Sequence, residues 1–143
     1  MLAMKLTHLA LLVLALSITT LGQSLTKPQI RLVSVTDAVN NQLAVKVYEI
    51  EVVNRAEISD EFFIAAPVLP PCGKNTNASR TWINLYDEKS VRIYGWCGIN
   101  SNGELASLRF MMQATDTPPK KIFIDLVDRA EGIVLRSNKA TIK

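Results

Sequence analysis

Histidine is nearly missing from this sequence of 143 residues, which contains only His8, close to the N-terminus. We expect that N-terminal segment to be removed, so the folded chain has no histidine for a Ser-His-Asp or Cys-His nucleophile or for the common zinc sites. Pairs of carboxylates are the remaining catalytic candidates, but adjacent acids in loops and turns are usually only solvated. These pairs are Asp60 with Glu61, Asp87 with Glu88, and Asp125 with Asp128. We therefore predict that the protein is not an enzyme and binds neither a metal nor a cofactor.

The N-terminal segment has the parts of a secretory signal peptide. Lys5 is followed by the apolar run "LTHLALLVLALSI" and then by the small-residue stretch "TTLGQS". Cleavage after Gly22 would remove residues 1–22 and send the rest outside the cytoplasm, either secreted or periplasmic. The apolar run is shorter than the roughly 20 residues that a spanning helix needs. We therefore expect no membrane insertion after cleavage, with an uncleaved membrane anchor as the alternative.

Charge of either sign is sparse and shows no pattern. The chain has 16 lysines and arginines against 13 acidic residues, a net charge of +3, and its basic residues are scattered. Such a distribution predicts no nucleic-acid partner. Repeats and low-complexity segments are also missing, so we expect one domain over residues 23–143.

Apolar stretches of strand length, separated by turn residues, fill the rest of the chain. The clearest is "LAVKVYEIEVVN", in which apolar and acidic residues alternate as in a half-buried strand. No stretch predicts a helix. Seven short strands predict an all-β fold, a β-sandwich of the immunoglobulin or fibronectin type III kind. The expected strands cover residues 29–38, 43–54, 81–86, 91–97, 105–113, 120–128 and 132–142.

The stretch "SRTWINLYDEKSVRIYGWCG", residues 79–98, holds both tryptophans of the chain. A hairpin with a three-residue loop, residues 88–90, needs a last loop residue that tolerates positive φ, and Ser90 is acceptable there. This register pairs Trp82 with Trp96 and sends the aliphatic side chains to the core, whereas a two-residue loop would mix both kinds on both faces. It predicts one outward binding face, formed by Trp82, Asn84, Tyr86, Arg92, Tyr94 and Trp96.

Two interpretations of this face stay open. Flat aromatic rings beside Asn84 and Arg92 can bind a partner protein or stack on sugar rings. Alternatively, the long connection over residues 54–80 folds over the rings and buries them. The two cysteines favour such a cover, because in an exported protein an even pair predicts a disulfide. A bond between Cys72 and Cys97 would tie this connection to the open end of the hairpin.

The polar part of that connection, "GKNTNASR" at residues 73–80, is a second candidate for binding. Its side chains can make hydrogen bonds to their own backbone, and without acidic ligands the stretch does not predict a calcium site. Asn77 begins a glycosylation sequon that matters only in a eukaryotic secretory pathway. The structural alternative is that Arg80, or Arg129, pairs with Asp128 or Asp87. The residues of this candidate loop are Lys74, Asn75, Asn77 and Arg80.

The motifs "LPPCG", "NTNASRTW" and "YGWC", followed by "FIDLVDR" and "RSN", resemble those of a family of uncharacterised bacterial secreted β-sandwich proteins. The resemblance covers roughly residues 44–139 and implies export, the fold and the disulfide, but no activity or ligand. The chain departs from that pattern at three positions. Trp96 stands where phenylalanine is usual, Ser90 where glycine is common, and Val68 where an acid is common.

Together these observations predict a non-catalytic secreted module for binding or scaffolding at the cell envelope. We expect a protein partner that contacts the aromatic face or the disulfide-tied loop. One alternative is carbohydrate binding by stacking on Trp82, Tyr94 or Trp96, which requires two exposed and roughly coplanar rings. Another is inhibition of an extracellular hydrolase by the loop "PVLPPCGKN", which would have to protrude.

Overall fold

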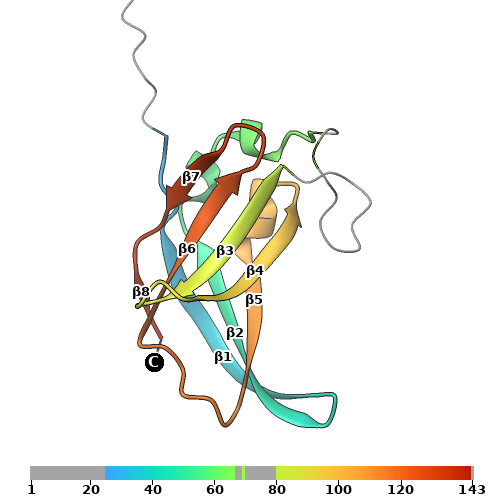
Figure 1. Cartoon of the computed structure of the whole chain (residues 1–143), viewed down its shortest axis with the longest axis vertical. Coiled ribbons are helices and arrows are strands. Elements are labelled where there is room, and N and C mark those ends of the chain that lie inside the picture. The colour runs from blue at the N-terminus through green and yellow to red at the C-terminus, as the bar shows by residue number, and fades with distance from the viewer. Residues whose placement is uncertain (1–24, 67–68, 70–79, 143) are drawn as a thin grey trace, which may run out of the picture.

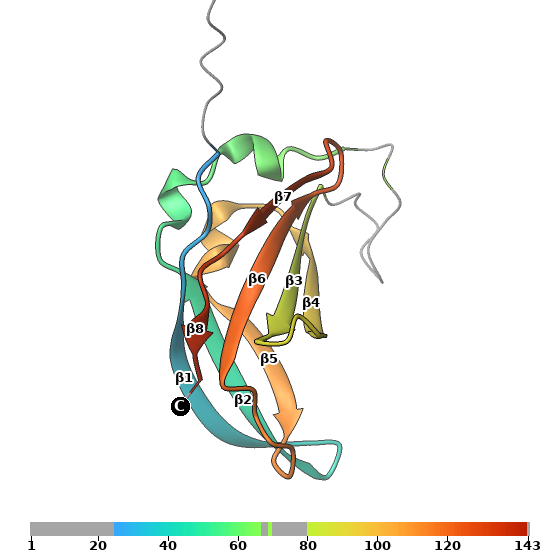
Figure 2. The same cartoon turned by 60° about the vertical axis from the view of Figure 1, so that its left-hand side comes forward.

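Two antiparallel sheets make up the protein in this computed structural model, which describes residues 25–66, 69 and 80–142. Sheet A has the order β1-β2-β5 and sheet B the order β4-β3-β6-β7, with β8 paired to β6. Sheet B lies in front in Figure 1, and sheet A extends beyond it at the lower end of Figures 1 and 2. The strands are β1 (Ile30–Asn40), β2 (Leu43–Val52), β3 (Thr81–Asp87), β4 (Arg92–Ile99), β5 (Leu108–Gln113), β6 (Lys121–Asp128), β7 (Ile133–Arg136) and β8 (Ala140–Thr141).

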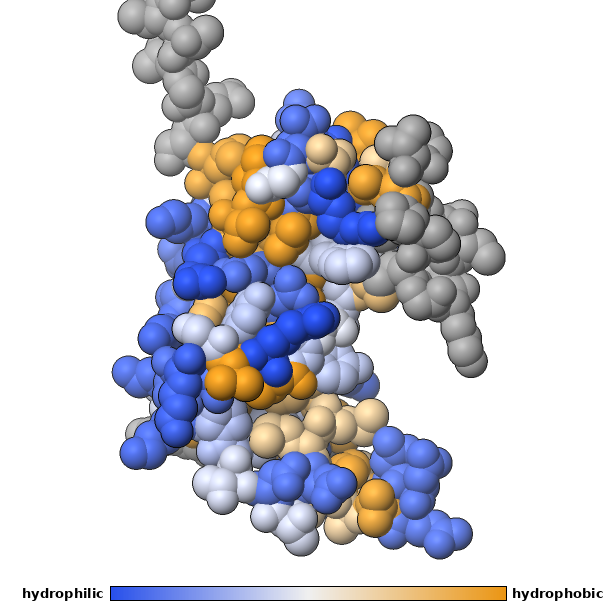
Figure 3. Space-filling model, viewed as in Figure 1, coloured by the Kyte–Doolittle hydropathy of each residue, from blue (hydrophilic) through white to orange (hydrophobic). Residues whose placement is uncertain are grey.

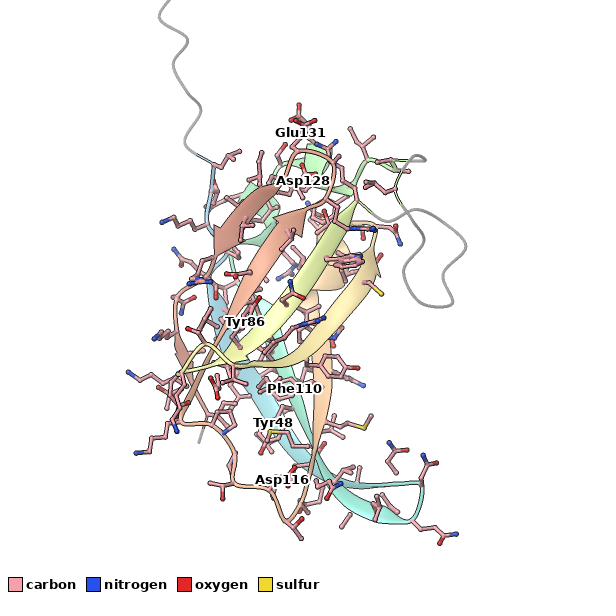
Figure 4. The ribbon with its side chains drawn as sticks, viewed as in Figure 1. Tyr48, Tyr86, Phe110, Asp116, Asp128 and Glu131 are labelled. Carbon is pink, nitrogen blue, oxygen red and sulfur yellow. The ribbon has the colours of Figure 1, made fainter. Side chains whose placement is uncertain are left out.

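The core lies between the two sheets and follows from the alternation of side chains along the strands. In β3, Ile83 and Leu85 are fully buried while their neighbours are half-buried. In β2, Tyr48 and Ile50 face them from sheet A, and Tyr48 stacks on Phe110 of β5 with ring centroids 5.0 Å apart (Figure 4). Each buried side chain of this size contributes about 1.5–3 kcal/mol to the free energy of folding. The sequence prediction of an all-β fold with two packed sheets is therefore confirmed.

Short 3-10 turns, and no α-helix, connect the strands in the described residues. These are η1 (Arg55–Glu57), η2 (Asp60–Phe63) and η3 (Asn102–Ala106). Within η2, Phe62 is buried in the core and its carbonyl accepts a hydrogen bond from the Thr81 hydroxyl. The described half of the 54–80 connection thus closes the upper end of the sandwich in Figure 1 and does not cover the front of sheet B. None of the helical segments described has the length and apolar character needed to cross a membrane.

The last predicted strand, residues 132–142, is interrupted and becomes β7 and β8. Ser137 pairs with Ile124 of β6 through its own hydroxyl, which accepts from the Ile124 N–H at 2.9 Å. The next residue, Asn138, turns its amide toward sheet A. Its Oδ1 accepts from the Ile30 N–H at 2.7 Å and its Nδ2 donates to the Ile30 carbonyl at 3.1 Å. One side-chain amide therefore replaces a strand partner for β1 and links the two sheets.

Candidate functional site

The β3–β4 hairpin begins in the predicted register. Tyr86 pairs with Arg92, and the Asp87 N–H donates to the Val91 carbonyl at 3.0 Å, which leaves residues 88–90 as the loop. Ser90 has φ 66°, as a three-residue loop requires. The Asp87 carboxylate accepts from the N–H groups of Lys89 and Val91 and so stabilises this turn. The predicted loop length and the role of Ser90 are confirmed.

Beyond the turn, an extra residue in β4 changes the register. Ile93 has no partner in β3, because Tyr86 pairs with Arg92 while Leu85 pairs with Tyr94. This β-bulge moves residues 94–97 of β4 by one position, so that Trp96 lies opposite Ile83. The predicted pairing of Trp82 with Trp96 is therefore wrong, because Trp82 lies opposite Cys97. The prediction assumed an unbroken ladder, which a bulge does not keep.

The bulge divides the four aromatic residues between the two sides of the hairpin. Tyr94 and Trp96 turn to the side of Ile83 and approach Phe110 in sheet A, with ring centroids 6.4 Å apart in each case. The Trp96 indole N–H donates to the Arg109 carbonyl at 3.0 Å. The Tyr94 and Trp96 rings meet at 63°, so they do not form the coplanar pair that sugar stacking requires.

The outer face of sheet B is the surface that keeps the other members of the predicted site. Trp82, Asn84 and Tyr86 alternate outward along β3, and Arg92 joins them from β4. The register of β6 adds partners that the sequence analysis did not assign to this face. They are Val127 opposite Trp82, Asp125 opposite Asn84, and Phe123 opposite Tyr86.

Phe123 is the clearest member that the sequence could not reveal. Its ring stacks on Tyr86 at 5.2 Å with an interplanar angle of 15°, and it is 1% exposed although it lies outside the core cluster. The Arg136 guanidinium lies 4.6 Å and the Lys139 ammonium 5.7 Å from the Phe123 ring centroid. In the sequence, an apolar residue in "KIFIDLVD" resembles any core residue, so no local signal marks it.

Cations gather on this outer face. Arg129 lies 4.1 Å above the Trp82 ring centroid. Arg136 makes two hydrogen bonds of 2.8 Å to Asp125, and this carboxylate raises the pKa of Arg136. Arg136 faces Asp125 across β6 and β7, and Arg92, Arg129 and Lys139 lie on the same face. In Figure 3, hydrophilic and hydrophobic patches adjoin across the front of sheet B.

Arg80, predicted either as a ligand residue or as a brace, is a brace. Its guanidinium donates to both carboxylate oxygens of Asp128, at 2.9 and 2.7 Å, next to the β6–β7 turn (Figure 4). Burial acts to raise the pKa of Asp128, but hydrogen bonds from Arg80 and from the N–H groups of Glu131 and Ala130 outweigh it, and the pKa lies below its ordinary value. This pair fixes the end of sheet B.

Several predicted site residues lie outside the described residues: Cys72, Lys74, Asn75 and Asn77. Cys97 is described and is not a free thiol, but its pairing with Cys72 stays a prediction. In the described ranges, no three His, Cys, Asp or Glu side chains are grouped so that they could hold a metal ion.

Comparisons of the chain with protein-family models, with curated proteins and with solved structures found no match. The resemblance to bacterial secreted proteins therefore stays a prediction, and the function has to be argued from the geometry of the outer face.

Proposed function

We propose that the protein is a non-catalytic, exported binding module that holds a protein partner on the outer face of sheet B. One observation carries the proposal: Trp82, Tyr86 and Arg92 stand on one face of the same sheet. Tryptophan, tyrosine and arginine are the residues that most often contribute large binding energies at protein interfaces.

The side chains of this face are already ordered without a partner. Tyr86 is fixed by its stack on Phe123, and Trp82 by the guanidinium of Arg129. Binding therefore costs little further side-chain entropy, which is estimated at 0.5–1.5 kcal/mol for each mobile side chain that an interface immobilises. A rigid, nearly flat surface of this kind fits a macromolecule better than a small ligand, which would need a deep cleft.

The proposal has three further parts: export of the protein, a disulfide bond and the type of β-sandwich. Residues 1–22 direct export to the periplasm or the exterior, and a Cys72–Cys97 disulfide forms there. The absence of a free thiol at Cys97 supports this bond. The two antiparallel sheets around one core support a sandwich of the immunoglobulin or fibronectin type III kind. Mass spectrometry of unreduced peptides tests the bond, since the joined Cys72 and Cys97 peptides must appear as one species.

Site-specific photo-crosslinking tests the binding face itself. A photoreactive phenylalanine derivative replaces Tyr86 on sheet B or, as the control, Thr36 on the exposed side of sheet A. In cells that export the protein, we expect a defined crosslinked species from position 86 and none from position 36. Equal crosslinking from both positions, or none from either, would show that sheet B does not hold the partner.

A further inference from the structure

A small hollow lies in the outer face of sheet B, next to the hairpin. Its volume is about 70 Å³. Gly95 forms its floor: a Cβ there would stand 2.3 Å from Nη2 of Arg92 and 3.4 Å from the Ile83 carbonyl. Only glycine at this position lets the guanidinium of Arg92 lie across the strand. The lining residues are Trp82, Asn84, Arg92, Gly95, Trp96 and Cys97.

Three of the side chains around this hollow, those of Trp82, Asn84 and Arg92, carry hydrogen-bond donors. Arg92 offers a guanidinium, and within the described ranges no carboxylate lies within ion-pair distance of it. Asn84 offers an amide. The Trp82 indole N–H is buried and has no acceptor in the described part of the protein.

The size and charge of the hollow select the class of ligand. Sites for whole small molecules measure about 300–1,000 Å³, so 70 Å³ accommodates only the end of a group that projects from something larger. A guanidinium binds a carboxylate through two parallel hydrogen bonds. Arg129 lies on the same face, above the Trp82 ring, whereas Arg136 is paired with Asp125. An acidic side chain of a partner is therefore complementary to Arg92 at this hollow.

We propose that the hollow over Gly95 is a subsite for a carboxylate, and that it receives an aspartate or glutamate side chain from an acidic segment of the partner protein. This inference rests on the proposed function, because it names the chemistry of the partner that the outer face holds. Arg92 binds the carboxylate, Asn84 supplies a further donor, and the Trp82 ring forms the wall.

The two tryptophan indole N–H signals can report binding at the hollow, with Trp82 as the probe and Trp96 as the internal control. In a ¹H–¹⁵N spectrum of the purified protein, the Trp82 indole N–H should move saturably when a hexaglutamate peptide is added. The Trp96 indole N–H should stay in place, since it already donates to the Arg109 carbonyl. A hexaglutamine peptide should move neither signal. Movement of both signals together, or of neither, would overturn the proposal.

Three variants separate the subsite from general charge. R92Q removes the guanidinium, and G95A keeps the charge but displaces it from the hollow. Each should weaken hexaglutamate binding about tenfold or more, as expected when a charge-assisted hydrogen bond is lost. R31Q, which removes an exposed cation from sheet A, should change it less than twofold. The unchanged Trp96 signal reports that each variant is folded. Wild-type affinity in R92Q would overturn the proposal.

Two other anions, and the photo-crosslinking experiment carried out in the R92Q variant, complete the test. A stronger shift of Trp82 with hexagalacturonate or inorganic phosphate than with hexaglutamate would overturn the assignment to a protein carboxylate. Crosslinking from position 86 is then repeated in R92Q. A partner trapped at undiminished yield would show that the face binds protein without this subsite, whereas reduced yield supports it. Failure of crosslinking in the unmodified background concerns the proposed function instead.

Discussion

The outer faces of the two sheets arrange their cations differently. On sheet A, cations lie beside carboxylates of the same face: Arg31 pairs with Glu51, and Arg109 with Glu49 at 3.3 Å. On sheet B, cations lie above aromatic rings: Arg129 above Trp82, and Arg136, which is also paired with Asp125, above Phe123. Arg92 of sheet B has no carboxylate within ion-pair distance in the described ranges, so it is the cation left to bind the carboxylate proposed above.

The largest difference in stability between the two sheets should appear when one carboxylate on each sheet is replaced by its neutral amide. D128N leaves Arg80, whose side chain is only 18% exposed, without its partner and should lower the free energy of unfolding by about 3–5 kcal/mol. E51Q disturbs Arg31, which is 70% exposed, and should cost about 0–1 kcal/mol. Urea unfolding measures both. Equal losses would mean that the burial of the Asp128 pair does not distinguish the two sheets.

A smaller difference in the free energy of unfolding is expected between variants of two arginines, one on each sheet. R136A removes both hydrogen bonds to Asp125 and the cover of the Phe123 ring, so it should cost about 1–2 kcal/mol. R109A removes only an exposed pair with Glu49 and should cost at most about 0.5 kcal/mol. Thermal unfolding of both variants checks the order, and a larger loss in R109A would contradict the role given to the stacked cation.

Acid should weaken sheet B through Asp128. Its pKa is lower in the folded than in the unfolded chain, so its contribution to stability is complete above the ordinary value of 3.8 and is lost as pH falls through the folded pKa. We expect the free energy of unfolding to fall less between pH 5 and pH 2 in D128N than in the unmodified protein. Parallel curves for the two proteins would show that Asp128 does not carry this pH dependence.

The smallest effects are expected at the two hairpin turns. Gln42 in sheet A and Ser90 in sheet B have φ of 67° and 66°, a conformation that glycine adopts without strain. Q42G and S90G should each raise the free energy of unfolding by about 0.5–1 kcal/mol. S101G is the control, because Ser101 is extended at φ −155° and glycine there should not stabilise. A gain in S101G equal to the other two would contradict the explanation.

Much of the fold could be predicted because strands and turns have local signals. The alternation of Ile83 and Leu85 with Trp82, Asn84 and Tyr86 placed β3 and its buried face correctly, and the expected separation of aromatic from aliphatic side chains selected the three-residue loop. The end of the chain was predicted as one strand because Ser137 and Asn138 give no strong stop signal. Their interruption depends on bonds to β6 and β1, which come from distant parts of the chain.

The binding face was predicted only in part, and the bulge explains why. A register counted outward from the turn holds only until the first extra residue, and nothing in "VRIYGWC" marks Ile93 as one. The bulge places Trp96 where it can pack against Phe110 and donate to the Arg109 carbonyl of sheet A. These partners belong to β5, outside the hairpin, so the hairpin sequence alone does not reveal them.

The all-β architecture, the core side of β3 and the turn that joins it to β4 follow from the sequence alone, because each depends on side-chain alternation or on a single φ angle. Which aromatic rings face outward, and which cations lie above them, depends on the assembled fold. Those choices depend on contacts between segments that are distant in the sequence, such as Arg129 with Trp82 and Lys139 with Phe123. The bulge in β4 is of the same kind, since it places the half-buried Trp96 against Phe110 of sheet A.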